Sequence, residues 1–205
     1  MADTSELDAL IVRNIGDVEA ALLRAYDIGD EVVEAIGSAI RLGLDDTWEV
    51  AVEVDDNPPI RFSKRAWLDG QPQSLSGAYH FSLSEKNGAG GETDETWLMT
   101  LLGDGPNGSS AVLYLWSDTF HAKRRWKKLL DDQSDLIDRL LDAGFRQDSD
   151  QWLYLPVAID GEALANGFEI GDLSAAMAPV TDALGIIQSG MPDIEALIER
   201  NRTFD

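Results

Sequence analysis

The spacing of apolar residues changes twice between residues 111 and 157. The runs at 111–116 and 152–156 are short, aromatic and aliphatic, which is typical of strands. Residues 119–143 repeat apolar side chains three or four positions apart, which predicts one long amphipathic helix. Its apolar stripe consists of Ala122, Trp126, Leu129, Gln133, Leu136 or Ile137, and Leu140. The segment therefore predicts a strand, a helix and a strand, with Asp118 capping the helix and Gly144 ending it.

Helical spacing also dominates both ends of the chain. Residues 4–43 predict two helices that form a hairpin or a bent helix, with a possible kink at Gly16 and a second helix at 30–42. The apolar side of the first helix consists of Leu7, Leu10, Ile11, Val18, Ala21, Leu22 and Ala25. After the last strand we expect a short helix at 160–166, a helix at 173–187 interrupted at Pro179, and a final helix that begins near Pro192.

Alternation with a period of two appears between these helical ends. Residues 48–54 send valines and Trp48 to one face, which predicts a half-buried strand. Further strands are expected at 60–68, 78–84 and 96–102, joined by short or glycine-rich loops. Strands that follow one another in this way favour antiparallel pairing.

Together these elements predict an α+β fold in a single domain of residues 1–205. We expect a central, mostly antiparallel sheet of about five strands, packed by the helices. The N-terminal helical segment spans residues 1–45, the sheet and long helix span 46–158, and the C-terminal helical segment spans 159–205. With 44% hydrophobic residues in 205, the chain can bury a sizeable core.

The charge is strongly negative, with 38 acidic and 16 basic residues and a net charge of −22. Three interpretations fit: an acidic surface that only keeps the protein soluble, a surface for a basic protein partner, or coordination of cations. Nucleic acid and anionic membranes would be repelled. The absence of cysteine excludes disulfides and thiolate chemistry. Without a long apolar run or a leader, we expect a cytoplasmic protein that does not enter a membrane.

One short basic segment stands out against this acidity. The basic island at 123–128, with the neighbouring histidine, is a candidate anion-binding site at a helix start. Its residues are His121, Lys123, Arg124, Arg125, Lys127 and Lys128. The alternative is a counter-ion patch that neutralises an acidic neighbour inside the protein.

Signals for catalysis are weak. Glu49, Glu53 and Asp55 share one side of a predicted strand and its exit, so they are weak candidates for a hard-cation site, and outward polar residues are ordinary on such a strand. The order helix, three strands, helix, strand resembles the core of the restriction-endonuclease-like nucleases, but their Glu-x-Lys motif does not occur in this sequence. The glycines at 103–108 match a dinucleotide-binding spacing but are expected between two strands, which excludes that motif. No cofactor is expected.

These observations favour a non-catalytic binding or regulatory protein that acts through a protein partner, with its acidic surface as the contact and a basic protein as one candidate partner. The alternatives are a divalent-metal-dependent phosphodiester hydrolase of nuclease-like topology and an anion-binding module that uses the basic island. A homo-oligomer is also possible.

Overall fold

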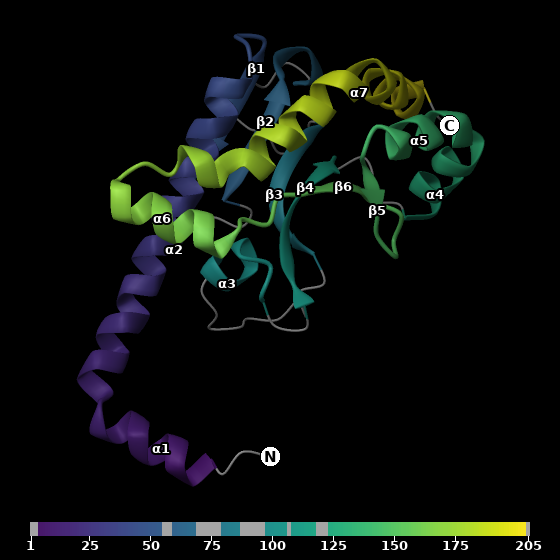
Figure 1. The fold of residues 1–205 in the computed structure, drawn as a ribbon. Helices are drawn as coiled ribbons and strands as arrows, with labels where there is room; N and C mark the ends of the chain where they lie inside the picture. Colours follow the sequence, from purple (N-terminus) through teal and green to yellow (C-terminus); the bar gives the residue numbers. More distant parts are fainter. Residues whose placement is uncertain are drawn as a thin grey trace.

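A six-stranded antiparallel sheet forms the centre of the computed structural model, with strand order β1-β2-β3-β4-β6-β5 (Figure 1). The structure describes residues 4–54, 59–68, 79–86, 97–105, 108–117 and 123–203, without the side chains of residues 4 and 123–125. The strands are β1 (Trp48–Val52), β2 (Ile60–Lys64), β3 (His80–Lys86), β4 (Ser110–Trp116), β5 (Arg146–Gln147) and β6 (Leu153–Pro156). The predicted α+β class is confirmed, but the sheet has six strands rather than about five. The additional strand, β5, is only two residues long and leaves no periodic signal in the sequence.

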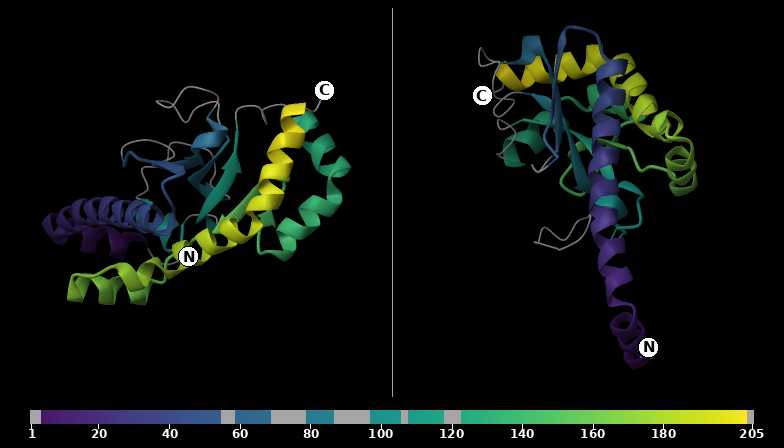
Figure 2. Two further views of the ribbon diagram at one scale, coloured as in Figure 1. Left: turned by 90° about the horizontal axis from the view of Figure 1, so that it is seen from above. Right: turned by 90° about the vertical axis from the view of Figure 1, so that its left-hand side faces the viewer.

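One face of the sheet carries the core. Phe62 stacks on Phe81 in the neighbouring strand, with 5.3 Å between ring centroids, and Phe81 in turn lies opposite Leu115 of β4. Leu113 continues this row to Leu155 of β6. The helices gather on one side of the sheet, as the left panel of Figure 2 shows. The alternation of apolar and polar positions in the strands therefore decides which face receives the helices.

The N-terminal region contains a short helix and a long one. Helix α1 spans Thr4–Arg13 and helix α2 spans Ile15–Gly43. The predicted boundary at residues 28–30 is wrong, because Gly29 lies inside α2, where it is buried beside the backbone of Leu98. The break comes instead at Asn14. Only the C-terminal part of α2 packs on the sheet, through Val32, Val33, Ile36 and Ile40.

The C-terminal region folds into helix α6 (Gly161–Ile170), the 3-10 helix η4 (Ser174–Met177) and helix α7 (Ala178–Thr203). The predicted interruption at Pro179 is wrong because this proline lies in the first turn of α7, where a missing N–H costs no helical hydrogen bond. Pro192 lies inside α7 instead of starting a new helix. A proline in a helix interior causes a bend, and α7 changes direction along its length in Figure 2.

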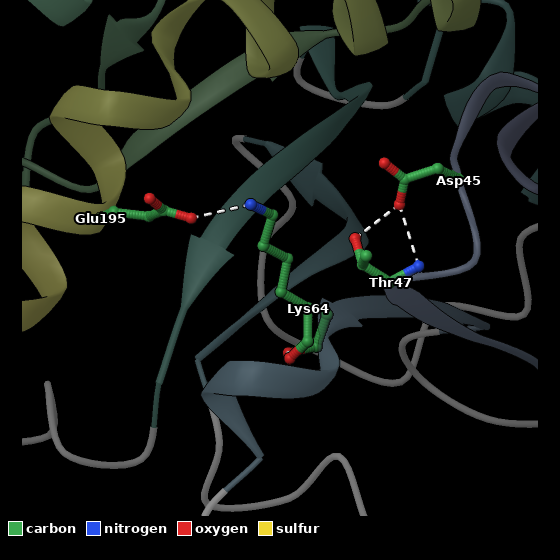
Figure 3. Close-up of polar contacts among 5 residues, drawn as sticks. Asp45, Thr47, Lys64 and Glu195 are labelled. Atoms are coloured by element: carbon green, nitrogen blue, oxygen red, sulfur yellow. Dashed lines mark hydrogen bonds and ion pairs between the residues drawn. The ribbon is translucent and has the colours of Figure 1, made fainter.

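Helix α7 crosses the sheet and is fixed to it by polar contacts. Lys64 Nζ of β2 lies 2.7 Å from Glu195 Oε1 of α7 (Figure 3). Asn201 Nδ2 donates to the hydroxyl of Tyr79 over 2.8 Å, and the Asn201 side chain is buried. These polar contacts fix the orientation of α7 on the sheet, whereas the burial of apolar side chains supplies most of the stabilisation of the helix.

The long helix predicted at 119–143 is two helices, α4 (Lys123–Asp132) and α5 (Ser134–Asp142). The chain turns at Gln133, the one polar position of the predicted stripe, and that side chain is only partly buried. The rest of the described stripe is buried as expected, and Trp126 stacks on Trp152 with 5.3 Å between ring centroids. Gly144 follows with a φ of 117°, which confirms that it ends the helix. Asp118 lies outside the described residues.

The strand predicted at 96–102 is wrong. Trp97–Leu101 forms the short helix α3 instead, and β4 pairs directly with β3. A run of consecutive apolar residues does not distinguish a strand from a buried helical turn. The glycine-rich segment at 103–108 therefore follows a helix and leads into a strand. Among the described residues, no α-helix begins between Gly103 and β4, which disfavours the dinucleotide-binding motif.

Candidate functional site

The N-terminal part of the chain leaves the body of the protein. We call residues 4–28, which comprise α1 and the first half of α2, the arm. Figure 1 and the right panel of Figure 2 both show the arm extending away from the sheet. This differs from the expectation that both N-terminal helices pack on the sheet.

Helix and sheet dimensions explain why the arm extends. Helix α2 has 29 residues, so at 1.5 Å per residue it is about 44 Å long. Strands of five to seven residues are roughly 17–23 Å long, and six strands side by side cover about 24 Å. In either direction the sheet covers only about half of α2. Roughly 20 Å of the helix, or about 13 residues, must therefore project beyond it.

One face of α2 stays apolar along its whole length, although only half of it is covered. Ile36 and Ile40 are fully buried on the sheet, whereas Ile15 is 49% exposed and Leu22 is 50% exposed on the same side of the helix. Large apolar side chains of the arm that remain exposed are Leu7, Leu10, Ile11, Val12, Ile15, Val18, Leu22, Leu23 and Tyr26. We call the set the arm stripe.

Asn14 sets the bend between α1 and α2. Its backbone is non-helical, with φ of −120° and ψ of 24°, and its Nδ2 donates to the carbonyl of Leu10 over 2.8 Å. Asparagine competes well with helical hydrogen bonding through such local contacts. The kink expected at Gly16 therefore lies two residues earlier.

Acidic side chains border the arm stripe. Asp8 lies one turn from Ile11 and Val12, and Glu19 lies one turn from Ile15 and Leu22. The arm's Arg24 faces the other way, where its Nη1 lies 2.7 Å from Glu31 Oε1. That hydrogen bond raises the pKa of Arg24. Along α2 the edge of the stripe is therefore negative, with Arg24 engaged with carboxylates on the outer side, whereas Arg13 lies one turn from Leu10 at the end of α1.

The basic island is only partly described. Lys127 and Lys128 are exposed on α4, next to the buried Trp126 and Leu129. His121 and the side chains of residues 123–125 lie outside the described part of the chain. Both the anion-site and the counter-ion interpretations therefore stay predictions.

The weak metal candidates face arginines. Glu49 Oε1 lies 2.8 Å from Arg65 Nε, and Glu53 Oε2 lies 3.5 Å from Arg61 Nη2. Asp55 lies outside the described residues. Within the described part of the chain, no group of three or more His, Asp or Glu side chains is arranged to hold a metal ion.

The sheet face turned away from the core contains an aromatic and polar cluster that sequence reasoning did not single out. The Tyr114 hydroxyl donates to Asp148 Oδ2 over 3.0 Å, and burial together with this hydrogen bond raises the pKa of Tyr114. Tyr154 packs beside Tyr114, with Lys86 Nζ 5.3 Å from its ring centroid. Because Tyr114 is held in its protonated form, this cluster is better suited to fixing β4 against β6 than to proton transfer.

Sequence reasoning found the apolar residues of the arm but assigned them to the core. The length of the predicted helical segment could have indicated an uncovered face. An apolar face of about 40 residues would be about 60 Å long if straight, which is more than one small sheet can cover. In the described part of the chain, no helix combines the length and the apolarity needed to cross a membrane. Comparisons of the chain with protein-family models, curated proteins and solved structures found no match.

Proposed function

We propose that this is a non-catalytic binding protein that holds a segment of a protein partner against the arm stripe. The sequence predicts that an acidic surface makes the contact with the partner. In this proposal, acidic side chains contact the partner at the edges of the stripe. The apolar side chains at its centre provide the affinity.

The continuity of α2 carries the proposal. The same face of one helix is buried from Val32 to Ile40 and exposed from Ile15 to Leu22. Isolated helices are marginal in water, and contiguous exposed apolar surface is typical of interaction sites. A partner is the natural cover for the part that the sheet does not reach.

The size of the stripe fits binding of moderate affinity. Burying a leucine or isoleucine fully contributes about 1.5–3 kcal/mol, so half-exposed side chains contribute roughly 1 kcal/mol each. The nine residues of the arm stripe thus offer on the order of 10 kcal/mol before the cost of association, which starts at about 4 kcal/mol. The balance, at most about 6 kcal/mol, corresponds to dissociation constants of roughly tens of micromolar or weaker.

The hydrolase alternative receives no comparable support. Glu49 and Glu53 each face an arginine, which is the ordinary environment of an exposed carboxylate on a strand. This contact favours the binding function over metal-dependent chemistry.

A model peptide tests the proposal. The probe is an 18-residue amphipathic helix with leucines on one face and balanced lysine and glutamate elsewhere, titrated by fluorescence anisotropy. We expect Leu22→Gln to weaken binding by about tenfold, the effect of one buried leucine. Ala20→Gln, an exposed position on the opposite side of α2, is the matched control and should change affinity less than twofold. Equal effects of the two substitutions, or no binding to the unchanged protein, would refute the proposal.

A further inference from the structure

We infer that the partner presents an amphipathic helix whose apolar face is flanked by lysine or arginine. The inference rests on the proposed function of the arm. It specifies the conformation and the charge of the segment that the arm stripe holds.

The spacing of the stripe indicates a helix as the bound conformation. On α2, Ile15, Val18 and Leu22 follow one another at intervals of three and four residues, and the partly buried Ala25 continues this spacing. This heptad spacing matches the seam along which two helices pack side by side. A bound strand would leave backbone N–H and C=O groups facing an apolar helix surface, whereas a helix satisfies its own.

The charge of the arm selects the flanks of that helix. Residues 4–28 contain five acidic side chains and two arginines, and Asp30 follows directly after them. Asp8, Glu19 and Asp30 each lie one turn from a stripe residue, and one of the two arginines, Arg24, is directed to Glu31 and Asp27. A basic-flanked helix would therefore meet carboxylates along the seam.

The same charges disfavour a second copy of this chain as the occupant. Two arms would bring identical acidic edges together, on molecules that each carry a net charge of −22. Like charges across an interface reduce affinity and slow association, whereas opposite charges accelerate it. The observed charge pattern therefore points to a basic partner of a different sequence.

Three peptides with the same leucine face test the inference. Their flanks are lysine, balanced lysine and glutamate, or glutamate. We expect the lysine-flanked peptide to bind about tenfold more tightly than the balanced one at low salt, and the glutamate-flanked peptide to bind least. Raising the salt to 0.5 M should reduce these differences because exposed charges are screened.

Two single substitutions distinguish the effect of a carboxylate at the stripe edge on peptide affinity from the effect of the overall negative charge. Glu19→Gln should reduce the advantage of the lysine-flanked peptide. Glu34→Gln removes the same charge from an exposed position on the outer side of α2 and should leave that advantage unchanged. Val18→Gln combined with Leu22→Gln should abolish binding of all three peptides.

The remaining outcomes overturn one proposal or both. Stripe-dependent binding with no preference among the flanks would refute the inference and leave the proposed function standing. Binding that ignores the stripe variants would refute both. A stripe-dependent dimer in sedimentation equilibrium at micromolar protein would make a second copy the occupant. Stripe-dependent binding to phosphatidylcholine–phosphatidylglycerol vesicles, without peptide binding, would make a lipid surface the occupant.

Discussion

Asp45 organises the turn that takes the chain from α2 into β1. Both the backbone N–H and the hydroxyl of Thr47 donate to Asp45 Oδ1, the former over 2.9 Å (Figure 3). An aspartate that accepts from the residue two positions ahead fixes a tight turn without help from the core. These hydrogen bonds, with that from the Thr47 hydroxyl first, lower the pKa of Asp45.

Replacing Thr47 with alanine should raise the pKa of Asp45 toward its ordinary value because one donor is lost. A lowered folded-state pKa adds stability above the unfolded-state pKa, about 3.9, and this stability is lost as the pH falls through the folded value. In Thr47→Ala the free energy of unfolding should therefore depend less on pH between the folded-state and the unfolded-state pKa of Asp45. Carboxyl carbon chemical shifts followed by NMR against pH measure the effect. Asp172, whose pKa is lowered mainly by the backbone N–H of Ser174, is the internal control, and a parallel shift there would contradict the local explanation.

At the level of whole elements, the sequence predicts strands and helix faces well but not what covers them. The strands that contain Trp48, Phe81, Leu113 and Leu155 were recognised from their alternation or apolar character. The apolar run at Trp97–Leu101 was misassigned because a short buried helix and a buried strand have the same composition. The break at Gln133 depends on how two helices fit the sheet, which local periodicity does not encode.

The candidate site escaped prediction for the same reason. An apolar stripe predicts that a face will be covered, and in the arm that cover is not provided by the described part of the chain. The sequence predicts a break near Gly29 and hence a hairpin or a bent helix, whereas α2 continues through this position. In the structure this glycine is buried beside the backbone of α3 and does not end the helix.

Two isoleucines on α2 test whether the sheet-covered half of the helix contributes to stability while the arm half does not. Ile36 is fully buried, so Ile36→Ala should lower the free energy of unfolding by about 2–5 kcal/mol. Ile15 is 49% exposed. Ile15→Ala should therefore change the free energy of unfolding by less than about 0.5 kcal/mol, since alanine is also the better helix former. Urea denaturation of both variants measures the difference. A comparable loss at Ile15 would mean that the arm is packed in solution.

For the whole molecule, charge and shape act together. The body buries a continuous core between the sheet and its helices, while the arm carries apolar surface away from it. A net charge of −22 opposes association between copies. Under the proposed function, the same charge would attract a basic partner to the surface on which the arm is displayed.

Hydrogen exchange along α2 tests the central claim most directly. In the free protein, amides at residues 15–27 should exchange at least about 100-fold faster than those at 32–40, because among the described residues the contacts of α2 with the hydrophobic core begin only at Ile28. Saturation with the lysine-flanked peptide should slow exchange in the arm and leave residues 32–40 unchanged. Equal protection of both halves in the free monomer, or arm exchange that the peptide does not slow, would contradict the assignment of the arm as a binding surface.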